Sequence, residues 1–121
     1  CDLQGRCHQD IACLELDERS ARTVFPYLTP EYLVVSNIQR DTMLRNPHTE
    51  YIFDIINKYL PKKTKLILNS DDLISSQLGK DNEKVFYKVD IQENEKFKDN
   101  IVKDITVCPI CHSELKWKFI R

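Results

Sequence analysis

The stretch Leu66-Ile67-Leu68-Asn69-Ser70-Asp71-Asp72 decides the fold of this chain. Its first three residues are apolar, as in a buried strand, and they run directly into an amide, a hydroxyl and two carboxylates. Ligands of open α/β sheets bind beyond the carboxyl ends of the strands. An apolar run that ends in polar side chains therefore predicts both a strand and a candidate site.

Apolar runs of strand length alternate with helix-like segments along residues 1–90. Such alternation predicts an α/β fold with a mostly parallel sheet in the order β-α-β-α-β-α-β. Asp71 or Asp72 can cap the last helix, and Gly79 suits the position just after its end. The expected strands are residues 11–16, 32–35, 64–68 and 85–89, and the expected helices are residues 17–27, 49–60 and 73–78.

The composition fits one modest hydrophobic core. The chain has 121 residues, is 41% apolar and carries 18 basic against 19 acidic residues. Because these charges nearly cancel, they give no general attraction to nucleic acid or to anionic membranes. No apolar run approaches the roughly 20 residues that a transmembrane helix needs. We therefore expect no nucleic-acid partner.

The motif Cys108-Pro109-Ile110-Cys111 is a CxxC knuckle, which can present two thiolates to a tetrahedral zinc ion. Zinc needs two further ligands, and a zinc ribbon takes them from a second CxxC. Two other interpretations stay open. With His112 the motif matches a c-type haem attachment sequence, and the thiols can also be inert or redox-active. The odd total of five cysteines suits a reducing compartment better than a disulfide framework.

Polar residues after the expected strands are the candidate ligand-binding residues. Glu15 can hold magnesium, which prefers oxygen ligands, but an acid there also fits a plain helix start. Asn37 and Asp41 follow the second strand and fit either a ligand site or ordinary turn chemistry. Asn69 has the donor and acceptor that would read an adenine edge, and Asp72 can contact a ribose or a metal-bound water. Both also fit a simple helix cap.

Three stretches, in this order and spacing, resemble the central ATPase domain of the Mur ligase superfamily. Within it, they resemble the MurT-type subunits of lipid II isoglutaminyl synthase. MurT-type proteins carry a four-cysteine zinc ribbon inserted in this domain, and CPICHSEL at residues 108–115 is similar to its first half. The matching stretches are LELDE at 14–18, VVSNIQRD at 34–41 and LILNSDD at 66–72.

This resemblance implies an ATP-dependent, amide-forming ligase of peptidoglycan synthesis. Such enzymes amidate D-glutamate in lipid II, using ammonia from a glutamine amidotransferase partner of the GatD type. The resemblance also implies ATP, magnesium and zinc as cofactors, and a cytoplasmic location at the inner membrane face, where lipid II is held. By resemblance, Glu15, Asn37 and Asp41 belong to the magnesium and phosphate region, Asn69 and Asp72 to the nucleotide, and Cys108 and Cys111 to zinc.

The chain also departs from the family pattern. It contains no GxxGxGK[ST]-like phosphate loop, and residues 42–48 diverge from the expected acidic stretch. The chain begins with Cys1 instead of a methionine and stops at Arg121, soon after the CxxC motif. We therefore expect both ends to be cuts through a larger protein. We expect residues 1–90 to form a partial Mur ligase-like central domain and residues 91–121 a linker with the first half of a zinc ribbon.

A chain without the phosphate loop should be inactive as a synthetase by itself. Two alternatives to the MurT-type interpretation remain at this point. One is a folylpolyglutamate-synthase-like enzyme or another Mur ligase, which adds an amino acid instead of ammonia. The other is a non-catalytic zinc-ribbon interaction module.

Overall fold

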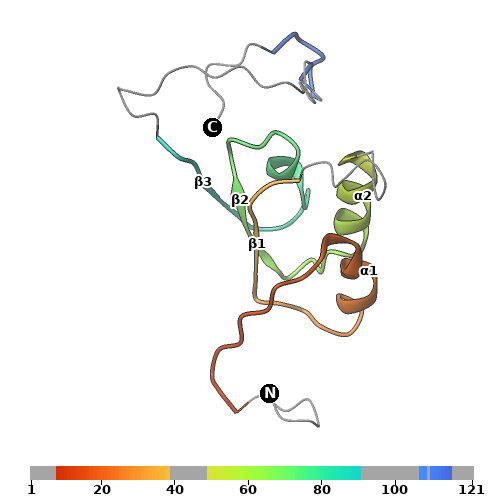
Figure 1. Ribbon diagram of the computed structural model, residues 1–121, viewed down its shortest axis with the longest axis vertical. Coiled ribbons are helices and arrows are strands. Elements are labelled where there is room, and N and C mark those ends of the chain that lie inside the picture. The colour runs from red at the N-terminus through yellow and green to blue at the C-terminus, as the bar shows by residue number, and fades with distance from the viewer. Residues whose placement is uncertain (1–7, 39–48, 91–106, 109, 116–121) are drawn as a thin grey trace.

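A parallel three-stranded sheet forms the centre of the computed structural model, which describes residues 8–38, 49–90, 107–108 and 110–115 (Figure 1). The strands are β1 (Tyr32–Val35), β2 (Lys65–Asn69) and β3 (Lys84–Tyr87), and they lie in the order β1-β2-β3. Both pairings are parallel. The predicted α/β class and parallel pairing are therefore confirmed.

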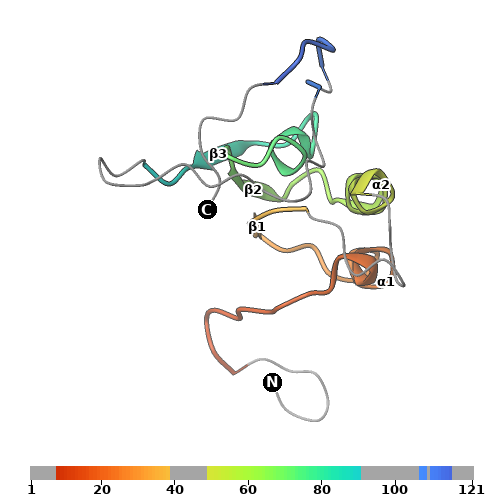
Figure 2. The same ribbon diagram turned by 45° about the horizontal axis from the view of Figure 1, so that its top comes forward.

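Two helices, α1 (Ala21–Val24) and α2 (Thr49–Tyr59), lie on one face of the sheet (Figures 1 and 2). The helix α2 buries three isoleucines whose spacing of i, i+3 and i+4 puts them on a single side. Beneath the helices, alternate residues of β2 are fully buried. The resulting core consists of Ala21, Phe25, Ile38, Ile52, Ile55, Ile56, Leu60, Leu66, Leu68 and Leu78.

The opposite face of the sheet is open on the described residues. Strand residues alternate between the two faces, so the register groups Val34, Ile67 and Val85 on this side. Val34 is 61% exposed and Val85 is 46% exposed. Parallel sheets are usually covered on both faces, and here the described helices cover one of them.

The predicted first strand is wrong: residues 11–16 form no strand in the structure. Ile11 is 85% exposed and Leu14 is 66% exposed, and the segment runs away from the sheet in both views (Figures 1 and 2). Leu16 packs against the core at the end of the segment. An apolar run becomes a strand only where a neighbour pairs with its backbone, and the run itself does not specify that neighbour. The full β-α-β-α-β-α-β order is therefore not found among the described residues.

The first predicted helix is present but short. It begins as a 3-10 turn, η1 (Glu18–Ser20), and continues as the single turn of α1. Asp17 caps it, because its carboxylate accepts the N–H of Arg19 at 3.0 Å. Pro26 has no N–H to donate, which limits continuation beyond this point.

The predicted helix at residues 73–78 is only a 3-10 turn, η2 (Ser75–Gln77). Gly79 follows its C-cap with a φ of 62°, the left-handed conformation that glycine adopts without a steric penalty. The expected role of Gly79 is thus confirmed, although the element before it is shorter than a helix.

No helix within the described ranges is long and apolar enough to cross a membrane.

Candidate functional site

The carboxyl ends of β1 and β2 lie side by side, because Val35 pairs with Leu68 in parallel register. Asn37 follows β1, and Asn69 ends β2, so both reach the same edge of the sheet. Asn69 also pairs with Tyr87 of β3. This edge is where a ligand site is expected in an open α/β sheet.

Asp72 joins the two loops at this edge. Its Oδ2 accepts the N–H of Ile38 at 2.7 Å, across 34 positions of sequence. The same carboxylate accepts the N–H groups of Ile74 at 3.1 Å and Ser75 at 3.3 Å, which lie in its own loop. Asp72 thus accepts N–H groups of its own loop, as a cap would, although the N-cap position of the 3-10 turn η2 is Ile74. The bond to Ile38 adds a link that the sequence did not indicate.

The side-chain amide of Asn69 uses its oxygen in a local hydrogen bond, whereas its nitrogen remains available as a donor. Its Oδ1 accepts the N–H of Asp71 at 2.9 Å, which holds the turn after β2. The amide nitrogen has no hydrogen-bond partner within the described part of the chain. The residue is half-buried at the end of the strand, so the remaining donor can serve a ligand.

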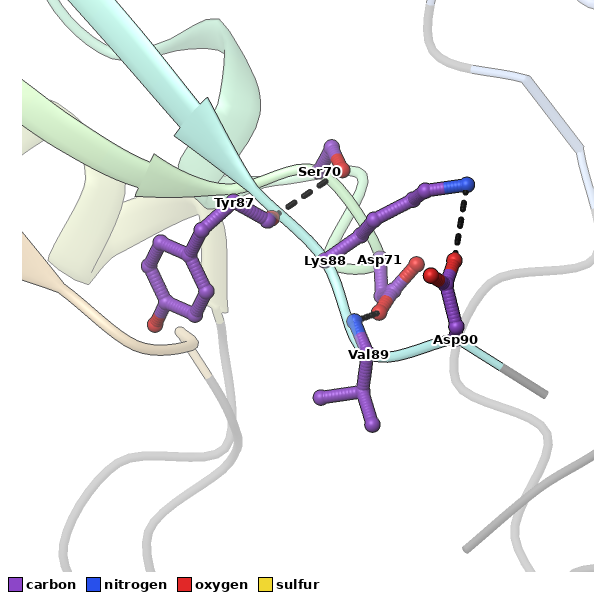
Figure 3. Close-up of polar contacts among 6 residues, drawn as sticks. All are labelled: Ser70, Asp71, Tyr87, Lys88, Val89 and Asp90. Carbon is purple, nitrogen blue, oxygen red and sulfur yellow. Dashed lines mark hydrogen bonds and ion pairs between the residues drawn. The ribbon is translucent and has the colours of Figure 1, made fainter. Parts of the chain in front are cut away.

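Ser70 and Asp71 tie the same loop to the end of β3 (Figure 3). The Ser70 N–H and hydroxyl both donate to the Tyr87 carbonyl, at 2.8 and 3.1 Å. The Asp71 Oδ2 accepts the Val89 N–H at 2.9 Å. The loop after β2 is thus anchored on both sides: Asp72 links it to the loop after β1, Ser70 links it to β3, and Asp71 links it to the segment just after β3.

A cavity of about 140 Å³ opens between α1 and the end of β1. Phe25 and Val35 form part of its apolar wall, and Ser36, Asn37 and Glu18 supply its polar groups. Glu18 is a carboxylate of the LELDE stretch that was not among the predicted site residues. The feature of the sequence that could have identified Glu18 is that it belongs to the same acidic cluster as Glu15.

The structure does not bring all the predicted magnesium ligands together. Glu15 is exposed in the segment before η1 and does not line the cavity that contains Asn37. Asp41 lies outside the described residues. Of the predicted magnesium and nucleotide residues, those gathered at the carboxyl edge of the sheet are Asn37, Asn69 and Asp72.

The CxxC motif forms a compact turn apart from the sheet. Cys108 N–H donates to the Ser113 carbonyl at 2.8 Å, and His112 N–H donates to the Cys108 carbonyl at 2.9 Å. An antiparallel bridge between Val107 and Glu114 closes its base. His112 has a φ of 58°, which reverses the chain just after the second cysteine.

Both cysteines of this turn are free thiols. Hydrogen bonding lowers the pKa of the Cys111 thiol to about 7. The largest contribution comes from the Ser113 hydroxyl, 3.3 Å from Cys111 Sγ, and the Ser113 backbone and the Cys108 side chain add to it. Within the described ranges no group of three or more histidine, cysteine, aspartate or glutamate side chains is arranged to hold a metal ion.

The chain is similar to MurT. It is 29% identical over 120 residues to the lipid II isoglutaminyl synthase (glutamine-hydrolyzing) subunit MurT of Staphylococcus aureus, in both strain COL and strain N315. The alignment covers 98% of this chain and 28% of each relative. The chain thus spans little more than a quarter of the length of the curated relatives that it matches. No protein-family model matches the chain, and no solved structure is significantly similar to it.

Proposed function

We propose that this chain is part of an ATP-dependent ligase of the MurT type, which amidates D-glutamate in lipid II. The observation that carries the proposal is the loop Asn69-Ser70-Asp71-Asp72 at the carboxyl edge of a parallel sheet, beside Asn37. This is the position at which α/β sheets bind ligands. The similarity to MurT along nearly the whole chain supports the same conclusion.

The reaction proceeds by activation of a carboxylate. An oxygen of the α-carboxylate attacks the γ-phosphorus of ATP, which gives an acyl phosphate and ADP. Ammonia then attacks the carbonyl carbon. Inorganic phosphate leaves and takes with it the carboxylate oxygen that had attacked ATP, and the nitrogen loses a proton. Such chemistry depends mainly on positioning and on neutralising phosphate charge.

In this proposal, the loop after β2 contacts the adenine and the loop after β1 lies toward the phosphates. Asn69 marks the adenine end, since its free amide nitrogen can donate to a ring acceptor. Asn37 lies toward the phosphates, with Glu15 and Asp41 as the proposed magnesium carboxylates. Glu18 is a further oxygen ligand in reach of this region, because it lines the same cavity as Asn37.

Zinc binding at Cys108 and Cys111 is a separate part of the proposal. The turn fits this metal in two respects: the thiols are free and close enough for the Cys108 side chain to influence the Cys111 sulfur. A lowered thiol pKa also favours the thiolate that zinc requires. Two cysteines supply half of a tetrahedral site, so the other two ligands must come from elsewhere. Bound zinc would stabilise the turn without taking part in the amidation.

The remaining elements of the proposal follow from the similarity. A glutamine amidotransferase subunit of the GatD type would supply ammonia, and the acceptor would be lipid II at the inner face of the membrane. Residues 1–90 would be a partial central domain and residues 91–121 the linker and the half ribbon. The chain by itself would lack synthetase activity, because it contains no phosphate loop.

The test uses the full-length product of the reading frame that contains this chain. It is incubated with lipid II, ATP and magnesium, and either ammonium chloride or single amino acids is added. We expect ADP release and replacement of one hydroxyl by an amino group in lipid II, detected by mass spectrometry and dependent on ammonium. Addition of an amino acid instead would identify another Mur-type or folylpolyglutamate-synthase-like ligase. No ATP consumption with any acceptor would contradict the ligase assignment.

A variant links this activity to the edge of the sheet. Asn69→Ala removes the amide donor and is expected to raise the KM for ATP about tenfold, the effect of losing one or two ligand hydrogen bonds. The matched control is Lys80→Ala, an exposed position in the turn before β3. An unchanged KM for ATP in Asn69→Ala would remove Asn69 from the nucleotide site.

A further inference from the structure

The geometry points to Asp72 as a positioning residue, which locks the loop after β1 to the loop after β2 and does not itself bind the nucleotide. The inference deepens the proposed function and rests on it for the identity of the ligand. The lock itself is a property of the chain and can be tested without any ligand.

The carboxylate of Asp72 is already committed to backbone groups. Oδ2 accepts the Ile38 N–H at 2.7 Å and the Ser75 N–H at 3.3 Å, while Oδ1 accepts the Ile74 N–H at 3.1 Å. Hydrogen bonds to an ionised acceptor are shorter and about twice as strong as neutral ones. Three of the roughly four acceptor sites of this carboxylate are thus occupied by backbone groups, which favours a structural use of Asp72.

Of these three hydrogen bonds, the one to Ile38 bears on function, because it holds the loop that carries Asn37. Ile38 is 2% exposed and belongs to the core, so its N–H is removed from water and needs an acceptor. Its neighbour in sequence, Asn37, is exposed at the edge of the cavity. By holding Ile38, Asp72 fixes the point from which Asn37 projects, relative to the loop that carries Asn69.

Asp71 provides a matched comparison within the same loop. Its carboxylate also accepts a distant backbone N–H, that of Val89 at 2.9 Å, but this bond leads to the end of β3 (Figure 3). Asp71→Asn and Asp72→Asn make the same chemical change one residue apart. Asp72→Asn weakens the link to the loop after β1, whereas Asp71→Asn weakens the link to the segment after β3.

The experiment follows backbone amide hydrogen exchange by NMR on this chain and the two variants. Asp72→Asn leaves Ile38 with a weaker acceptor, so its exchange should become about 10- to 100-fold faster, the range expected for loss of a hydrogen bond to a charged group. In Asp71→Asn the exchange of Ile38 should stay unchanged. Unchanged exchange of Leu66 and Leu68 in both variants shows that the sheet is intact. Equal exchange of Ile38 in all three proteins would overturn the lock.

A second measurement covers the case in which Asp72→Asn does not fold. In the unmodified chain, a scalar coupling across the hydrogen bond should join Ile38 N to the carboxyl carbon of Asp72. The bond from Leu66 N to the Glu83 carbonyl, at 2.9 Å, is the positive control. A coupling for the control without one for Ile38 would overturn the inference.

Adding Mg·ATP to the unmodified chain separates a positioning role from a ligand role. If Asp72 positions the loops, nucleotide leaves the exchange of Ile38 unchanged or slows it. If nucleotide takes the carboxylate, exchange of Ile38 speeds up, and the positioning role is wrong. A chain whose amides do not respond to Mg·ATP at any concentration, but whose Ile38 is released by Asp72→Asn, counts against the nucleotide site and supports the lock.

Discussion

Single residues in the turns of this molecule act largely through backbone groups. Asn69, Asp71 and Asp72 each accept backbone N–H groups, and together they hold the turn after β2 in place. Asn82 plays a similar part at the other end of the sheet, where its amide nitrogen donates to the carbonyls of Pro61 and Thr64 at 2.9 and 2.8 Å. Polar side chains that satisfy buried backbone groups are costly to remove, because an unpaired partner is left behind.

Gly79 is predicted to tolerate no side chain. Its φ of 62° is unfavourable for alanine, and a Cβ would crowd Leu66 and lie 2.7 Å from Asn82 Oδ1. Gly79→Ala should lower the free energy of unfolding by about 2–4 kcal/mol, from backbone strain and overpacking together. Urea denaturation measures this change, with Lys80→Ala as the control. A loss below that of the control would show that the turn can rearrange.

Cys111 is predicted to react as a thiolate near neutral pH. Because its pKa is lowered to about 7 from the ordinary 9.0, its alkylation rate in metal-free buffer should rise through pH 7 and then level off. Ser113→Ala removes the main cause, so the midpoint should move toward higher pH. Mass spectrometry of the alkylated peptide follows the rate. A midpoint that is the same in both proteins would contradict the role of the Ser113 hydroxyl.

At the scale of the elements, the two faces of the sheet differ in what they contribute. The face under α1 and α2 supplies the core, whereas the other face is open on the described residues. Stability should therefore depend on which side of a strand is changed. β1 and β2 offer a direct comparison.

Leu68→Ala should cost about 2–5 kcal/mol of unfolding free energy, because the side chain is fully buried beneath the helices. Val34→Ala, on the open face, should cost less than about 1 kcal/mol. Urea denaturation of the two variants provides the comparison. A large loss for Val34→Ala would mean that the open face is covered in solution.

The sequence predicted β1, β2 and the longest helix best. Residues 32–35 and 64–68 form β1 and β2 almost as expected, and the helical periodicity from Thr49 corresponds to α2. The run at residues 11–16 has a similar composition but pairs with no strand among the described residues, and composition cannot reveal this. Likewise, the sequence indicated that Asp72 accepts N–H groups of its own loop. Its bond to Ile38 was not, because it joins residues 34 positions apart.

At the scale of the whole molecule, the sheet edge and the CxxC turn are separate candidates for function. The sheet edge gathers Asn37, Asn69 and Asp72, and the turn carries Cys108 and Cys111. Residues 91–106 join the two parts and lie outside the described ranges. The ligase proposal depends on the first part, and the zinc proposal depends on the second.

Zinc content is predicted to differ between this chain and the full-length product of its reading frame. With two cysteine ligands, this chain should retain far less than one zinc per molecule after gel filtration with a weak chelator. The full-length product should retain about one, and Cys108→Ser should abolish it. Elemental analysis gives both values. Full zinc in this chain would mean that other residues complete the site, and none in either protein would contradict the zinc part of the proposal.

Transfer of oxygen-18 from the acceptor carboxylate to phosphate tests the ligase assignment most directly. The full-length product is given lipid II labelled in the α-carboxylate of D-glutamate, with ATP, magnesium and ammonium. An acyl phosphate intermediate requires that each phosphate released carries one labelled oxygen. We predict one label per phosphate, formed in step with amidated lipid II. Release of unlabelled phosphate, with the label retained in lipid II, would contradict the proposed function.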